Sequence, residues 1–180
     1  PEWAGGHTFN PVNGITRNPF NLNRTAGGSS GGSAAALASG QVWLATGNDL
    51  GGSLRTPASF NSVVGLRPSL GVVPRGQRHL PFDNLWVEGP MARCVKDVAL
   101  MLDAGCGYSS QDPLSFDHPY KPFLLSLNDF DLPKKIAFSY DLGIVPVEQE
   151  IRQITSSSLN ILRKSGIEIS DNIPDFSGIL

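Results

Sequence analysis

The sequence predicts an α/β fold in which a mixed β-sheet core is covered by helices. Residues 134–140, 147–164 and 167–170 follow one another as an expected strand, helix and strand, an order typical of a sheet with helices on its faces. Upstream, residues 42–46 form a short apolar run that indicates a buried strand. Residues 94–104 carry apolar side chains at helical spacing. Together these observations favour the α/β class.

The first 31 residues predict irregular backbone that packs against the rest of the protein. They are rich in Gly, Asn, Pro and Thr and show no sustained hydrophobic period. Large apolar side chains recur among them at Trp3, Phe9, Phe20 and Leu22, which a solvated linker would not need.

The next elements lead to a glycine turn. A helix is expected over 33–39, with Ser33 as its cap and Gly40 at its end. The strand at 42–46 follows and runs into the turn at Ser53, where another helix begins. Strand, turn and helix start therefore coincide at this serine.

The second half alternates loops with amphipathic helices. A Pro- and Arg-rich loop reaches Gly89, and residues 107–133 predict a long surface excursion because Pro, Gly and Asp interrupt them. Each of the two helices is expected to turn one apolar face inward. The inward residues are Val95, Val98, Ala99 and Leu102 in 94–104, and Ile151, Ile154, Ile161 and Leu162 in 147–164.

Composition and charge exclude several classes of protein. The 14 basic and 16 acidic residues give a net charge of −2, so no direct nucleic-acid binding is expected. No apolar run approaches the roughly 20 residues that span a bilayer, so we expect a cytoplasmic protein with no membrane partner. Cys94 and Cys106 predict buried free thiols, and the three scattered histidines indicate no metal site. The sequence predicts no cofactor.

Two glycine-rich motifs predict serine chemistry. Residues 27–33 have the sequence GGSSGGS, and residues 49–55 have the sequence DLGGSLR. Glycine lets backbone N–H groups approach a ligand closely, so such stretches form concavities that bind an oxyanion. Ser53 is the candidate nucleophile, and Ser29 is the candidate hydroxyl partner from another part of the fold. An acyl-transfer hydrolase is the favoured class.

Other interpretations of the first motif are weaker. Residues 28–32 also fit the G-x-S-x-G nucleophile elbow around Ser30, but that elbow follows a strand and residues 21–26 do not resemble one. A phosphate-binding loop needs a lysine where Ser33 stands. A flexible linker remains the plain alternative for this motif taken alone, and the aromatic flanks and the second motif argue against it.

The two motifs and their neighbours resemble the amidase signature family, whose members cleave carboxamide bonds with two serines and a lysine. The resemblance extends in order and spacing along the first hundred residues. It is carried by residues 16–19, 24–32, 49–57, 63–68 and 89–93. It implies an amidase signature fold, which is incomplete in this chain.

The resemblance also implies a role for each motif residue. Ser53 is implied to be the acylated nucleophile, and Ser29 to be the cis-serine that passes protons and faces the substrate. The N–H groups of Leu50, Gly51, Gly52 and Ser53 are implied to form the oxyanion hole. We expect a serine acyl-enzyme formed on a small-molecule amide.

Three further residues are expected to support this site. Asp49 and Arg55 flank the nucleophile, and charged groups in such loops usually hold the loop through hydrogen bonds. Ser30 is expected to support the first motif. The family usually carries Ser or Thr immediately before the aspartate, whereas this chain has Asn48.

The family's lysine has no counterpart in this chain. It precedes the double-serine motif in the family, and the first lysine here is Lys96. The resemblance therefore implies that residues 1–180 are the central part of a single amidase signature domain, inactive alone, from a stand-alone amidase. Two alternatives stay open: an amidase-like chain that binds without turnover, and an amidotransferase A-type subunit. Assembly into a homo-oligomer also stays open.

Overall fold

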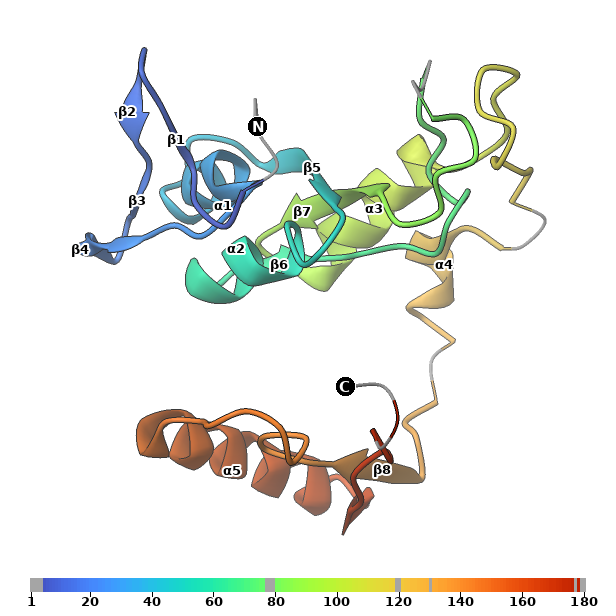
Figure 1. Ribbon diagram of the computed structural model, residues 1–180. Coiled ribbons are helices and arrows are strands. Elements are labelled where there is room, and N and C mark those ends of the chain that lie inside the picture. Colours follow the sequence, from blue (N-terminus) through green and yellow to red (C-terminus); the bar gives the residue numbers. More distant parts are fainter. Residues whose placement is uncertain (1–4, 77–79, 119–120, 130, 177, 179–180) are drawn as a thin grey trace. The chain divides into compact units, whose positions relative to one another are not determined.

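The computed structural model of the protein describes residues 5–76, 80–118, 121–129, 131–176 and 178 (Figure 1). The chain divides into two compact units, unit 1 over Pro1–Asp129 and unit 2 over Phe130–Leu180. Both combine helices with strands, so the predicted α/β class is confirmed. Both serine motifs belong to unit 1.

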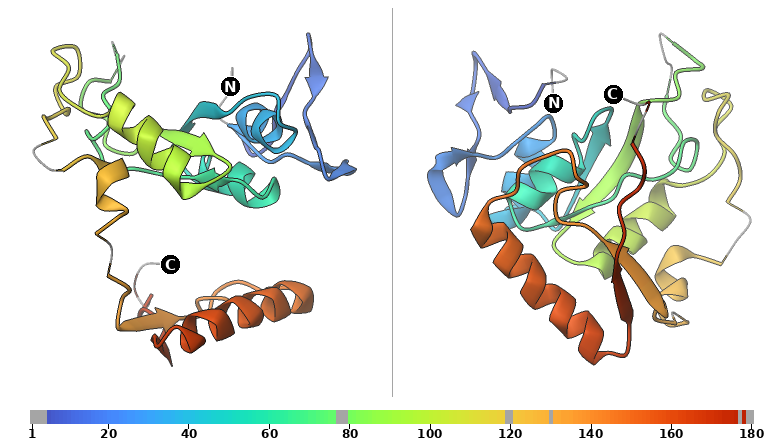
Figure 2. Two further views of the ribbon diagram at one scale, coloured as in Figure 1. Left: turned by 180° about the vertical axis from the view of Figure 1, so that it is seen from behind. Right: turned by 60° about the horizontal axis from the view of Figure 1, so that its bottom comes forward.

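The centre of unit 1 is a three-stranded antiparallel sheet in the order β5-β7-β6. Its strands are β5 (Leu44–Asp49), β6 (Val64–Gly65) and β7 (Val87–Ala92). Three helices pack on it: α1 (Gly31–Ala38), α2 (Arg55–Phe60) and α3 (Val95–Gly105). The further views show α3 running along β7 (Figure 2). The core consists of Ala34, Leu37, Leu54, Ala58 and Met91.

Two hairpins precede this sheet, where irregular backbone was expected. They are β1 (Phe9–Asn10) with β2 (Gly14–Ile15), and β3 (Arg17–Asn18) with β4 (Asn21–Thr25). The cause is local, because asparagine side chains accept hydrogen bonds from the N–H groups two or three residues on and close the turns. Phe9, Phe20 and Leu22 are 65%, 68% and 66% exposed, so their expected packing is wrong in unit 1, and Trp3 lies outside the described residues.

The first helix and the strand after it are shifted from their predicted positions. α1 begins at Gly31, and Ser33 does not cap it, because its hydroxyl donates to the carbonyl of Thr46 instead. β5 begins at Leu44 and leaves Trp43 79% exposed. The Arg93 guanidinium donates to the carbonyls of Leu37 and Val42, so it holds the turn that precedes β5. Gly40 ends the helix as predicted, with φ +75°.

The predictions for α3 and the loop after it are confirmed in part. Val98, Ala99 and Leu102 are buried, whereas Val95 is 57% exposed. Cys94 is exposed and Cys106 half-buried, so the expectation of two buried thiols is wrong. Both lie at the ends of α3 rather than on its packed face.

The expected surface excursion over 107–133 contains more order than predicted. Asp112 is fully buried there and accepts hydrogen bonds from the N–H groups of Arg75 and Leu114. A short helix, α4 (Phe123–Ser126), is fixed by Asp103, which accepts bonds from its first N–H groups.

Unit 2 has the predicted β-α-β order. β8 (Lys135–Phe138) and β9 (Glu168–Asp171) pair in parallel, and α5 (Gln149–Lys164) connects them. Leu159 and Ile167 are buried. The isoleucines expected to face inward are not covered within this unit, because two strands bury only one stripe of the helix. Ile151, Ile154 and Ile161 are 51%, 58% and 66% exposed, and Leu162 is half-buried.

Candidate active site

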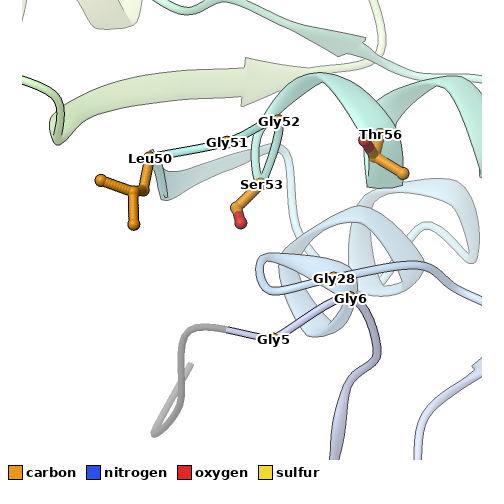
Figure 3. A pocket seen from close by; sticks show the side chains of 8 residues that line it. All are labelled: Gly5, Gly6, Gly28, Leu50, Gly51, Gly52, Ser53 and Thr56. Atoms are coloured by element: carbon orange, nitrogen blue, oxygen red, sulfur yellow. The ribbon is translucent and has the colours of Figure 1, made fainter. Parts of the chain in front are cut away.

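Ser53 lies in the turn between β5 and α2 and faces a cavity of about 280 Å³. The cavity is lined by residues from three stretches of unit 1: Gly5, Gly6, Gly28, Leu50, Gly51, Gly52, Ser53 and Thr56. Figure 3 shows the Ser53 side chain pointing from its turn toward the side of the cavity formed by Gly5, Gly6 and Gly28.

The two serine motifs meet beside this cavity. The Ser30 N–H donates to the Ser53 carbonyl over 3.2 Å. Ser29, whose peptide bond with Gly28 is cis, is 1% exposed. Its hydroxyl has no hydrogen-bond partner among the described residues. A buried hydroxyl without a partner costs free energy, so this atom marks a place where a further polar group fits.

Gly28 lies flush against the chain that precedes the first hairpin. A Cβ at this position would lie 2.6 Å from the Gly5 carbonyl oxygen and 2.7 Å from the His7 nitrogen. Such distances are too short for any side chain, so only glycine fits there. The glycines of the first motif therefore allow the close approach that builds one wall of the cavity.

Ser30 is bonded to the sheet rather than open to the cavity. Its hydroxyl donates to the Asn48 carbonyl over 3.4 Å and accepts from the Asn48 N–H over 3.3 Å. Asn48 makes this contact with its backbone, so the contact does not depend on the side chain that differs from the family pattern. The residues before the motif do form a strand, β4, contrary to expectation. The nucleophile-elbow interpretation still fails, because Ser30 is only 1% exposed.

Asp49 fixes the turn that carries Ser53. Its carboxylate accepts hydrogen bonds from the Gly52 N–H at 2.7 Å and from the Leu54 N–H at 3.2 Å. Arg55 donates to both carboxylate oxygens, at 2.9 and 3.0 Å, and Arg67 donates to Oδ1 at 3.2 Å and to the Asp49 carbonyl. Burial by itself raises the pKa of Asp49, but the hydrogen bonds from Arg55 and the two N–H groups outweigh it and hold that pKa well below its usual range.

The backbone donors of the turn divide into two groups. The Gly52 N–H donates a hydrogen bond to the Asp49 carboxylate, whereas it was expected to be free for an oxyanion. The N–H groups of Leu50, Gly51 and Ser53 have no acceptor among the described residues. All three residues line the cavity that Ser53 faces.

Three residues of this region were not singled out from the sequence. Thr56 lines the cavity one helical turn after Ser53. Arg67 reaches Asp49 from the loop after β6, and Thr8 bonds to the first serine motif from the N-terminal segment. The position of Thr56, three residues after the nucleophile at the start of a helix, was a usable signal. Arg67 lies in residues 63–68, which carry the family resemblance, but nothing in that segment indicates its contact with Asp49. Thr8 gave no signal, because tertiary folding brings it to the loop.

No group of three or more His, Cys, Asp or Glu side chains suited to a metal ion occurs among the residues that the structure describes. Within the same residues, none of the helices has the length and apolar character needed to cross a membrane.

Comparison with known proteins connects this geometry to one family. A family model described as Amidase matches residues 1–179. The chain is similar to the A-type subunit of the glutamyl-tRNA(Gln) amidotransferase of Cyanothece sp., with 39% identity over 93% of this chain and 35% of that protein. It is also similar to an acylamidase of Rhodococcus erythropolis, with 36% identity over 95% of this chain and 36% of that protein. The solved structure of a bacterial aryl acylamidase of the amidase signature enzymes has a TM-score of 0.85 and 37% identity, and covers 93% of this chain and 34% of that one.

The chain spans about a third of the length of the curated relatives that it matches.

Proposed function

This chain belongs to the amidase signature family, and from that premise we propose that it carries the nucleophile of an amidase that hydrolyses a carboxamide C–N bond. Ser53 is the residue acylated, Ser29 its proton-transfer partner, and the substrate a small-molecule amide. The observation that carries the proposal is the meeting of the two motifs. The Ser53 hydroxyl faces the cavity opposite Gly28, and the buried Ser29 hydroxyl has no partner among the described residues.

The reaction proceeds in two steps. The Ser53 oxygen attacks the amide carbon and gives its proton to the Ser29 hydroxyl, whose own proton passes to a base. The N–H groups of Leu50, Gly51 and Ser53 stabilise the oxyanion. The C–N bond then breaks as the leaving nitrogen takes a proton, and water hydrolyses the serine ester to release a carboxylic acid.

We propose that a lysine outside this sequence is the base. A neutral lysine in a dry site accepts a proton readily, and the unpartnered Ser29 hydroxyl offers it a hydrogen-bond position. We also propose that residues 1–180 are the central part of a single amidase signature domain. Their match to only 35% of a relative's length supports their being one part of a longer domain.

Labelling with a fluorophosphonate probe tests the assignment in the full-length protein. We expect wild type to be labelled at Ser53, Ser53→Ala to lose labelling and amide hydrolysis completely, and Ser29→Ala to be labelled roughly 10²- to 10⁴-fold more slowly. Ser39→Ala is the matched control, since Ser39 bonds carbonyls at the end of α1. Labelling of Ser53→Ala at the wild-type rate would contradict the assignment.

The relatives also include a subunit of an amidotransferase. An assay of ammonia or amine release by the full-length protein distinguishes that activity from amide hydrolysis. We expect the protein alone to release ammonia or an amine from small amides. Release that requires partner subunits and charged tRNA would instead assign it as an amidotransferase A-type subunit. Binding of an amide without release would assign it as a non-catalytic member of the family.

A further inference from the structure

We propose that Thr8 is a positioning residue for the catalytic serine loop over 27–31. Its hydroxyl holds the backbone that presents Ser29, so it acts on proton transfer without touching the substrate. This inference rests on the proposed function of Ser53 and Ser29 and assigns a role to a residue that no sequence motif marks.

The Thr8 hydroxyl makes hydrogen bonds to the backbone of this loop. It donates to the Gly27 carbonyl, at 3.0 Å, with the Ser29 carbonyl at 3.3 Å as a second acceptor. It accepts from the Gly31 N–H at 3.0 Å. One half-buried hydroxyl thus contacts the residues before, at and after the cis peptide bond.

The loop packs tightly against Thr8 at Gly31. A Cβ at Gly31 would lie 2.3 Å from the Thr8 hydroxyl oxygen and 3.0 Å from its Cβ. Thr8 is itself tied to the first hairpin region, because its carbonyl accepts a hydrogen bond from the Thr16 N–H at 2.9 Å. Thr8 therefore connects the first hairpin region to the serine loop, and its contact with Gly31 leaves no room for the loop to move toward it.

The loop needs such a support because of how Ser29 is held. The Ser29 hydroxyl has no hydrogen-bond partner among the described residues, so the backbone on either side sets its position. Misplacing a reacting group by about 1 Å costs roughly 10²-fold in rate. Losing the Thr8 hydroxyl removes the donor that the Gly27 and Ser29 carbonyls share and the acceptor of the Gly31 N–H.

The test compares Thr8→Val, which keeps the shape and removes the hydroxyl, with Thr8→Ser, which keeps the hydroxyl. In the full-length protein we expect Thr8→Val to lower kcat by roughly 10- to 100-fold with KM changed less than about threefold. We expect Thr8→Ser to restore kcat to within about threefold of wild type. Thr155→Val is the control, because Thr155 makes a comparable hydroxyl bond to a backbone carbonyl in α5.

The outcomes separate this inference from the proposed function. Wild-type kcat in Thr8→Val overturns the role of Thr8 alone, provided that Ser53→Ala is inactive. A loss in Thr8→Ser equal to that in Thr8→Val also overturns it, since the hydroxyl is then not the cause. If Thr8→Val fails to fold, Thr8→Ser decides by itself, because a loss of kcat well beyond threefold overturns the inference and a kcat within about threefold of wild type supports it. Full activity in Ser53→Ala overturns the proposed function, and the Thr8 inference fails with it.

Discussion

Asp49 shows how one side chain shapes the candidate site. It is fully buried, yet it is ionised, because four donor groups surround its carboxylate: the N–H groups of Gly52 and Leu54 and the guanidinium groups of Arg55 and Arg67. A buried charge is tolerated only when it is paired and hydrogen-bonded in this way. The Gly52 N–H is turned toward the aspartate, which fixes the turn that carries Ser53.

We expect Asp49→Asn to destabilise the full-length protein by roughly 2–4 kcal/mol at pH 7. The asparagine amide keeps the shape of the aspartate, but its NH₂ group faces N–H donors that need an acceptor. The loss of stability stays below that of a fully buried ion pair, because the Arg55 side chain is 56% exposed. Urea denaturation measures the change. Asp171→Asn, at an exposed position, is the control and should stay within about 0.5 kcal/mol of wild type.

Because the pKa of Asp49 is lowered, the difference in stability between wild type and Asp49→Asn depends on pH. The stabilisation from its charge is fully present above the ordinary pKa of 3.8 and is lost as the pH falls from there through the lower folded pKa. The gap between wild type and Asp49→Asn should therefore be constant near neutral pH and shrink in strong acid. A gap that widened on acidification would contradict the assigned charge state.

At the scale of elements, β5 and α1 approach closely because of a glycine. A Cβ on Gly47 would lie 2.6 Å from the Ser30 hydroxyl oxygen and 2.7 Å from a methyl carbon of Leu54. The strand can therefore carry its bonds to Ser30 only while position 47 has no side chain.

We expect Gly47→Ala to destabilise the protein by roughly 1–3 kcal/mol, as overpacking does, and to slow fluorophosphonate labelling of Ser53 because the Ser30 backbone moves with its side chain. Gly32→Ala is the matched control within α1. Nothing lies within 4 Å of a Cβ there, so it should stabilise the helix by up to about 1 kcal/mol. Thermal unfolding measures both, and equal effects of the two variants would rule out the steric explanation.

At the scale of the whole molecule, each unit has its own buried residues. The cavity and every candidate site residue belong to unit 1. Unit 2 buries Leu159 at 7% exposure on α5, while Ile154 on the same helix is 58% exposed.

We expect Leu159→Ala to cost roughly 2–4 kcal/mol of stability, because it opens a cavity, and to leave the Ser53 labelling rate of the folded protein unchanged. Ile154→Ala should cost less than about 1 kcal/mol. Denaturation and labelling of the full-length protein check both. An equal cost at Ile154 would mean that another part of the protein covers it, and slower labelling in Leu159→Ala would mean that unit 2 contributes to the site.

Local signals in the sequence determined much of this protein. Glycine spacing marked both serine motifs, the left-handed turn at Gly40 and the cavity turn at Ser53, while apolar periodicity marked the β-α-β unit. The tertiary structure alone decided which partners those motifs meet: Thr8 against the Gly31 N–H, Arg67 on Asp49, and Ser30 on the backbone of Asn48. It also decided that Ile151 stays exposed in its unit. The physical reason is that the local sequence pattern encodes the backbone preference of a residue, whereas contacts between residues 18 or more positions apart depend on how the elements pack.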